Sequence, residues 1–242
     1  MRWSLYPAIL FALALGLAAC TPPATDKPKE ETGTTGASGS SKPETAATEP
    51  VPDALKHEGF KYYGLEATNE QSYEFDMNGS KREGSQKLTY KGLKDGKPQF
   101  TIERSGALQQ IGTENVEVRE DGVYIVSTDR MQALKTAMMA LPAKLEVGKT
   151  WDITEDVKDD LGNDVKMKAT NKIDGPEKLK TAAGEFDCMV VSMTGTLDSN
   201  GKKQTVSGKT WFAAGIGTVK LQVTSQSGKD KPVAYTITLV KQ

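Results

Sequence analysis

The segment Val219-Lys220-Leu221-Gln222-Val223-Thr224 alternates apolar and polar side chains with a period of two. Successive side chains of a β-strand point to opposite faces of the sheet, so this alternation predicts a strand with one buried face. The chain closes on the same pattern, in which the apolar members are Val233, Tyr235, Ile237 and Leu239. Strands with one wet face favour antiparallel pairing, so this part of the chain is predicted to form an antiparallel sheet.

The same alternation recurs earlier in the chain. Its apolar members are Tyr73, Phe75 and Met77 in one segment and Val165, Met167 and Ala169 in another. Four dipeptides that tolerate positive φ separate such segments, namely Asp95-Gly96, Asp121-Gly122, Gly162-Asn163 and Asn200-Gly201. Short strands joined by turns at this spacing indicate a meander. The predicted fold class is therefore mainly β, an antiparallel meander curled into an open barrel or a sandwich.

One segment departs from the period of two and predicts a helix. Met131, Leu134, Met138 and Leu141 recur at spacings of three and four residues. Asp129 is a suitable N-cap for this segment, and Pro142 stops further helix. We predict one short amphipathic helix near residues 129–141. Such a helix either packs in the core or forms a methionine-rich lid over an apolar ligand.

Three blocks in the second half of the chain resemble a known group of proteins. They are Leu145-Glu-Val-Gly-Lys-Thr-Trp151, Thr181-Ala-Ala-Gly-Glu-Phe-Asp-Cys188 and Thr210-Trp-Phe-Ala-Ala-Gly-Ile-Gly-Thr-Val-Lys220. The group consists of uncharacterised bacterial β-rich lipoproteins and periplasmic proteins. Its domain is similar to the open barrel with an internal helix of the Lol lipoprotein carrier and receptor. The resemblance implies a fold and no catalytic residue.

The third block is also understandable from its own residues. Trp211 closes one predicted strand, and Val219 begins the next. Gly215 and Gly217 allow a tight link between them. No helix is predicted to follow these glycines and supply amide donors, so the block is not expected to hold a phosphate.

The beginning of the chain resembles a bacterial lipoprotein signal. Arg2 precedes an apolar run from Leu5 to Leu17, and Leu17-Ala18-Ala19-Cys20 matches the lipobox of that class. The run of about 13 residues is shorter than the ~20 that a membrane-spanning helix needs. The resemblance implies removal of residues 1–19, a diacylglycerol thioether on Cys20 and a further acyl chain, such as palmitate, on its amino group. A plain signal peptide, or a buried N-terminal helix with an incidental cysteine, is the alternative.

Residues 20–52 are predicted to form a disordered tether. They are mostly Thr, Pro, Glu, Lys, Ser, Gly and Ala, and no aromatic residue occurs among them. Such a segment buries too little apolar surface to offset the entropy of ordering it. A coil of this length spans roughly 30 Å. Residues 53–242 are predicted to form a single β-rich domain that can stand off the membrane.

Charge and composition exclude some classes of partner. The 242 residues carry a formal net charge of -1, and lysines and arginines do not cluster in the sequence. Nucleic acid is therefore not an expected partner. Cys188 has no second domain cysteine to pair with in an oxidising compartment, and its apolar surroundings predict a small buried core residue. A reactive thiol is the alternative.

The residues that carry chemistry form no convincing catalytic or metal site in the sequence. His57 is the sole histidine, so it cannot build a histidine-rich metal site. Asp156, Asp159, Asp160, Asn163 and Asp164 form an acidic loop that fits a solvated turn better than a calcium site. Paired carboxylates for glycoside hydrolysis depend on spatial separation, and nothing in the sequence selects a pair. We expect no enzyme activity, no metal and no cofactor.

These observations lead to an expected function at the cell envelope. We expect a protein anchored to a membrane through Cys20, which binds a lipid or other apolar ligand in a curved sheet. Met131, Leu134, Met138, Trp151 and Trp211 are the expected ligand-binding residues. Thr21 follows the anchor, so a source with two membranes would place the chain in the outer membrane facing the periplasm. With one membrane it would lie on the outer face of the cytoplasmic membrane.

Two other functions remain open from the sequence. The first is a structural or interaction partner of an envelope assembly, which presents an edge or a face of the sheet and holds no small molecule. The second is a glycan-acting hydrolase. An internal apolar cavity would favour ligand binding, whereas a filled core with a flat exposed apolar patch would favour the structural partner.

Overall fold

We describe a computed structural model of the chain for residues 49–67, 69–131, 134–159 and 162–242. The predicted signal segment 1–19, Cys20 and the predicted tether as far as residue 48 lie outside these residues, so the statements about them stay predictions. Within the described residues, no helix has the length and apolar character needed to cross a bilayer.

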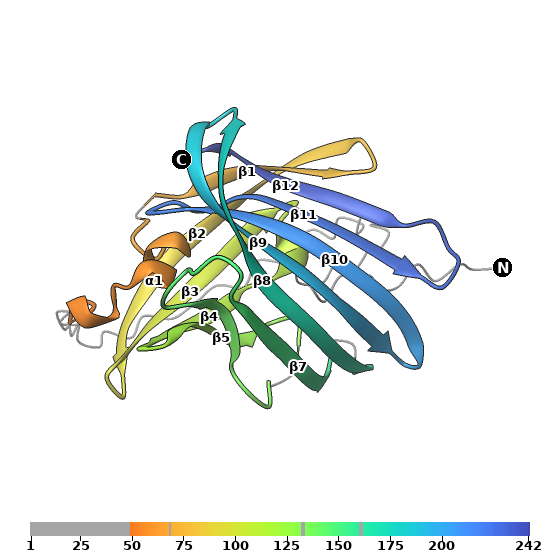
Figure 1. The fold of residues 1–242 in the computed structure, drawn as a ribbon, viewed down its shortest axis with the longest axis horizontal. Coiled ribbons are helices and arrows are strands. Elements are labelled where there is room, and N and C mark those ends of the chain that lie inside the picture. Colours follow the sequence, from red (N-terminus) through yellow and green to blue (C-terminus); the bar gives the residue numbers. More distant parts are fainter. Residues whose placement is uncertain (1–48, 68, 132–133, 160–161) are drawn as a thin grey trace, which may run out of the picture.

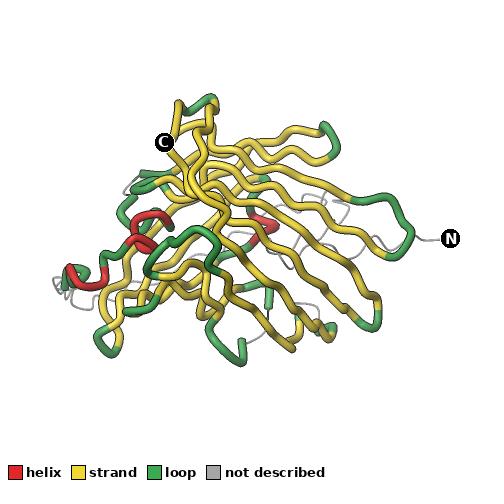
Figure 2. The backbone as a smooth tube through the Cα atoms, in the orientation of Figure 1, coloured by secondary structure: helices red, strands yellow, loops and turns green. Residues whose placement is uncertain are grey.

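The elements follow one another as a long run of strands with little helix (Figure 2). Short helices are η2 (Asp53–Leu55), α1 (Glu58–Tyr62) and η3 (Gln109–Ile111). The first six strands are β1 (Gln71–Met77), β2 (Ser80–Lys94), β3 (Lys97–Gly106), β4 (Glu114–Arg119), β5 (Gly122–Thr128) and β6 (Met138–Pro142). The last six are β7 (Thr150–Lys158), β8 (Asp164–Thr181), β9 (Gly184–Ser199), β10 (Lys202–Ala213), β11 (Gly217–Ser227) and β12 (Val233–Lys241).

The strands form one 12-stranded antiparallel sheet in the order β6-β5-β4-β3-β2-β1-β12-β11-β10-β9-β8-β7. Two meanders, β1 to β6 and β7 to β12, therefore meet where β1 pairs with β12. The sheet curls around a common interior, with α1 at one end (Figure 1). This architecture is a nearly closed barrel, and it confirms the mainly β prediction.

The two edge strands, β6 and β7, face each other across a seam. Trp151 Nε1 donates to the Met139 carbonyl oxygen at 3.0 Å, and Thr136 Oγ1 donates to Glu155 Oε1 at 2.5 Å. An isolated bridge joins Met131 to Asp159 farther along. Side-chain bonds and one bridge thus take the place of a continuous backbone ladder at the seam.

The alternation of the sequence places the core inside the barrel. On β8, Val165, Met167, Ala169 and Ile173 are buried, while Lys166 and Lys168 between them are exposed. The predicted alternation of β1 and β11 is confirmed in the same way, because Phe75 and Val219 are fully buried. Burying one such aliphatic or aromatic side chain contributes about 1.5–3 kcal/mol. At the start of β12 the pattern is interrupted, since Val233 is 40% exposed.

The predicted helix near 129–141 is wrong for the residues that the structure describes. Residues 138–142 form strand β6, and Leu134 lies in neither a helix nor a strand. A register shift in the pairing of β5 with β6 lets Met138 and Leu141, three residues apart, both point inward. A bulge therefore produced the three-residue spacing that we interpreted as helical.

Predicted turns join several strands. The Asp95-Gly96 and Asn200-Gly201 pairs have positive φ at both residues and connect β2 with β3 and β9 with β10. Such two-residue turns match the twist of the flanking strands. Gly162 and Asn163 lie between β7 and β8, whereas Gly122 is already the first residue of β5.

The segment around α1 closes one end of the barrel. His57 caps α1, because its Nδ1 accepts from the Phe60 amide at 3.1 Å. That bond makes Nε2 the protonated nitrogen, which donates to the Arg119 carbonyl oxygen at 3.0 Å. Gly64 and Gly217 lie so close that a Cβ at Gly217 would stand 2.9 Å from the Tyr63 carbonyl oxygen. Glycine is therefore required where this segment contacts the start of β11.

Candidate functional site

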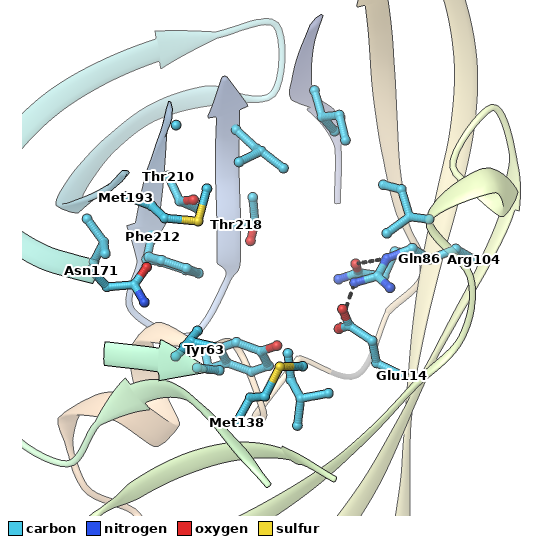
Figure 3. A pocket seen from close by; sticks show the side chains of 18 of the residues that line it. Tyr63, Gln86, Arg104, Glu114, Met138, Asn171, Met193, Thr210, Phe212 and Thr218 are labelled. Atoms are coloured by element: carbon cyan, nitrogen blue, oxygen red, sulfur yellow. Dashed lines mark hydrogen bonds and ion pairs between the residues drawn. The ribbon is translucent and has the colours of Figure 1, made fainter. Parts of the chain in front are cut away.

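A cavity of about 210 Å³ lies inside the barrel and is lined by residues from both meanders. Most of its lining side chains are apolar, among them Ile125, Val191, Phe212 and Ile237. Tyr63, which follows α1, lies at the closed end and stacks on Phe212 with 6.2 Å between ring centroids. Figure 3 shows these two rings at the cavity wall. The closing segment thus forms part of the site.

Methionine is the most distinctive component of the lining. Five of the eight methionines of the chain line the cavity, namely Met131, Met138, Met139, Met167 and Met193. Methionine side chains are flexible and polarisable, so they adapt to apolar ligands of different shapes. The cavity is therefore suited to an apolar guest rather than to one rigid polar substrate.

One wall carries a buried ion pair between β3 and β4. Arg104 Nη2 donates to Glu114 Oε2 at 2.9 Å, and the two side chains are only 10% and 2% exposed. Arg104 Nη1 also donates to the Gly112 carbonyl oxygen at 3.0 Å, and its Nε donates to Gln86 Oε1 at 3.2 Å. Burial lowers the pKa of Arg104, but the charge and the hydrogen bond of Glu114, together with the effects of Tyr63 and Tyr73, outweigh burial, and the net direction is upward. Arg104 and Glu114 thus form an ion pair that has no net charge.

Two tyrosines next to this pair stay protonated. Burial raises the pKa of Tyr63 well above its ordinary value, and the negative charge of Glu114 adds to the effect. Burial likewise raises the pKa of Tyr73. The Tyr73 hydroxyl donates to Gln71 Oε1 at 3.1 Å and lies 3.0 Å from the Thr218 carbonyl oxygen. These phenols act as neutral polar groups, and neither is set up as a general base.

The other wall carries a polar group without a protein partner. Asn171 on β8 is 8% exposed, lines the cavity, and has an Nδ2 with no hydrogen-bond acceptor among the described residues. Figure 3 shows its amide on the far side of the cavity from Arg104 and Glu114. A buried donor without a partner costs about 1–3 kcal/mol. Asn171 is therefore a position where a bound molecule could supply what the protein does not.

A protein-family model described as DUF3108-like matches residues 100–235, which is more than half of the chain. The chain belongs to the DUF3108-like family. Within this family match lie β4 to β11 and most of the residues that line the cavity.

The fold of this DUF3108-like chain is similar to that of a solved structure, and two further structures match it at lower TM-scores. A candidate lipoprotein from Parabacteroides distasonis matches with a TM-score of 0.54 and 14% identity, over 75% of this chain and 98% of that chain. A candidate exported protein with a YmcC-like fold from Bacteroides fragilis matches with a TM-score of 0.41 and 11% identity, over 71% and 93%. The hypothetical lipoprotein YmcC from Escherichia coli matches with a TM-score of 0.35 and 11% identity, over 76% of this chain and 90% of that chain. No curated protein matches the chain.

The structure brings some of the predicted ligand-binding residues of this DUF3108-like chain to the cavity. Met131 and Met138 line it, and Leu134 packs, partly buried, against the same core cluster. Trp151 lies at the seam, where it lines a second, neighbouring pocket. Trp211 is a buried core residue outside the cavity lining, with Lys220 Nζ 5.3 Å from its ring centroid.

Sequence reasoning missed the polar residues of the cavity, although the sequence contained a signal for them. Asn171 interrupts the inward-facing apolar residues of β8. Arg104 continues the inward set of Phe100 and Ile102 on β3, and Glu114 begins the inward set of β4. A polar residue on the apolar face of a predicted strand is the pattern that would have found all three.

The structure also shows the surroundings of Cys188 and of the acidic loop, which were considered as chemical groups in the sequence. Cys188 is buried, as predicted, and burial raises the pKa of its thiol to about 11, with Glu177 and Asp187 adding to the effect. In the acidic loop, Asp159 accepts from the Asn163 amide at 2.8 Å, and Lys158 Nζ pairs with Asp164 at 2.6 Å. Asp160 lies outside the described residues. Within them, no group of three acidic, histidine or cysteine side chains could hold a metal ion.

Proposed function

We propose that this DUF3108-like chain is a lipid-anchored protein of the cell envelope that binds a single-chain apolar ligand inside its barrel. It acts by binding and not by catalysis. The methionine-lined cavity of about 210 Å³ is the observation that carries the proposal. A cavity of this size suits one short alkyl chain or a small apolar molecule, because sites for larger drug-sized ligands measure ~300–1,000 Å³.

The anchor and the location rest on the start of the sequence. Leu17-Ala18-Ala19-Cys20 has the form of a lipobox, and acylation of Cys20 would hold the domain at the membrane. The Parabacteroides distasonis protein of similar fold is itself named a candidate lipoprotein, which agrees with this placement. We propose an outer-membrane position facing the periplasm where the source has two membranes. We also propose that the domain is related in fold to the open barrel of the Lol lipoprotein carrier and receptor.

The seam offers a path by which a ligand enters. Met138, Met139 and Ile153 line both the cavity inside the barrel and the neighbouring pocket at the seam. Opening β6 from β7 breaks a few side-chain bonds and no continuous ladder. Entry through the seam therefore costs less than separating any other pair of neighbouring strands.

The described surface supports ligand binding more than the scaffold alternative. Among the described residues, the exposed large hydrophobic side chains are Val147 and Val233, which do not form a broad apolar patch. The glycan-hydrolase alternative requires two carboxylates across a cleft. Within the described lining, Glu114 is the carboxylate, and Arg104 holds it.

The test uses methyl NMR of the full chain labelled at its methionine methyl groups and anchored in lipid nanodiscs. We expect methyl decanoate to shift the methyl resonances of the five cavity methionines and to leave those of Met77 and Met189 unchanged. Thr210→Phe, which places a ring in the cavity, should abolish the shifts. Thr205→Phe on the outer face of the same strand is the matched control. Equal shifts at all methionines, or none, would reject ligand binding in the cavity.

A further inference from the structure

We infer that Asn171 is a head-group subsite, which donates a hydrogen bond from Nδ2 to a carbonyl oxygen of a neutral, single-chain ligand such as an ester or an amide. This inference rests on the proposed ligand-binding function and specifies the chemistry of the ligand. It predicts that the cavity distinguishes between molecules that have the same alkyl chain and different polar ends.

The surroundings of Asn171 explain why its donor awaits a ligand. Its neighbours across the sheet are Trp151 on β7 and Met193 on β9. The Trp151 indole is a donor, and it is already bonded to Met139 across the seam. The Met193 thioether is at best a weak acceptor. Asn171 Nδ2 thus remains without a partner among the described residues at 8% exposure, on a wall that Met193, Val191 and Phe212 make mostly apolar and to which Thr210 adds a hydroxyl group.

The charge distribution of the cavity favours a neutral head group. Arg104 and Glu114 are the charged residues of the described lining, and they neutralise each other at 2.9 Å. Arg104 also donates to Gln86 and to the Gly112 carbonyl, so its Nε and both of its terminal nitrogens are engaged. A free carboxylate would enter as an unpaired buried charge, which is strongly unfavourable. A carbonyl oxygen accepts from Asn171 without that penalty.

The position of Asn171 also orients the ligand. Trp151 is paired with Asn171 in the β7–β8 register and bonds Met139 across the seam. The head group therefore lies just behind the seam, and the alkyl chain extends toward the methionines, Phe212 and Tyr63 (Figure 3). A ligand that enters chain first through the seam would arrive in this orientation.

The experiment compares methyl decanoate, decanoate and decane by methionine-methyl NMR titration of the full chain in nanodiscs. Each affinity ratio is compared between the wild-type chain and Asn171→Leu, so that partition of the ligands into the lipid cancels. We expect the ester-to-alkane affinity ratio to fall about tenfold in Asn171→Leu. After correction for the partition of each ligand into protein-free nanodiscs, we expect decanoate to bind the wild-type chain at least tenfold more weakly than the ester. Gln204→Leu is the matched control, because Gln204 is also a buried amide with an unpartnered atom and does not line the cavity.

The outcomes separate the two proposals. An unchanged ester-to-alkane ratio in Asn171→Leu, with the cavity methyl shifts preserved, would overturn the subsite and leave the binding function intact. Such a result would show that water, and not the ligand, hydrogen-bonds the Asn171 amide. Binding of decanoate as tight as that of the ester would overturn the neutral head group. Absence of cavity shifts with all three compounds would reject the binding function and the subsite together.

Discussion

Asn171 is a polar residue on a strand face that is otherwise built for burial, and its donor has no acceptor in the protein. Replacing an unpartnered buried amide by an apolar group of similar size removes a desolvation cost. We predict that Asn171→Leu raises the free energy of unfolding of the ligand-free chain by about 1 kcal/mol. Urea denaturation followed by tryptophan fluorescence measures the change. A loss of stability would mean that the amide has a structural partner.

The Arg104–Glu114 pair shows the opposite behaviour, because both members are buried and bonded. Glu114→Gln leaves the guanidinium without its counter-charge, and we predict a destabilisation of about 3 kcal/mol. The double variant Arg104→Met/Glu114→Leu should recover most of this loss, because it removes both charges. Asp187→Asn is the control, since the Lys178–Asp187 pair is 91% and 86% exposed and should contribute less than about 0.5 kcal/mol.

Cys188 makes the stability of the folded protein depend on pH in the alkaline range. Its folded pKa of about 11 lies above the ordinary value of 9.0, so the unfolded state loses its proton first as the pH rises. The stabilisation is complete below about pH 9 and is lost as the pH rises toward 11. We predict that iodoacetamide labels the native thiol far more slowly at pH 8 than it labels the urea-unfolded chain. Cys188→Ala should reduce the fall in the free energy of unfolding between pH 9 and pH 11. An identical fall in the wild-type chain and in Cys188→Ala would contradict the raised pKa of Cys188.

At the scale of the elements, the seam between β6 and β7 is the weakest junction of the sheet. Trp151→Phe removes the 3.0 Å bond to the Met139 carbonyl and keeps an aromatic ring. We predict faster amide hydrogen exchange in β6 and β7, by about five- to tenfold, because one bond contributes ~1 kcal/mol to holding the edges together. Trp211→Phe is the matched control, since the Trp211 Nε1 has no partner among the described residues. Equal effects of the two variants would mean that the indole bond does not hold the seam.

The strands were predictable where alternation was regular, and the prediction failed where a bulge broke it. The inward sets of β1, β8 and β11 follow from the period of two in the sequence. Met138 and Leu141 could not be placed correctly, because the register shift that brings both inside depends on pairing with β5. The β1–β12 pairing and the seam likewise depend on how the whole sheet curls, which no local pattern encodes.

The site is a property of the whole molecule, and this limited its prediction. Met131 and Met138 were predicted as ligand-binding residues through a helix that the described residues of this segment do not form, and they reach the cavity from the strands and loops near the seam. Trp211, chosen because it is a large aromatic residue, is held in the core instead. Arg104, Glu114 and Asn171 come from three different strands, and only the curled sheet brings them around one cavity.

The strand order also sets the sequence of events in folding. Most neighbouring strands within each meander are joined by short turns, and the longer connections are those from β3 to β4 and from β5 to β6. Each half can therefore form largely from local hairpins at low entropic cost. The pairing of β1 with β12 joins Ser72 to Lys241, and it must wait until nearly the whole described chain has been made. Until then β1 and β12 each expose an unpaired edge, which is the type of surface through which chains aggregate. We therefore expect closure at the centre of the sheet, and not at the seam, to be the slow step during which the chain is most exposed to aggregation.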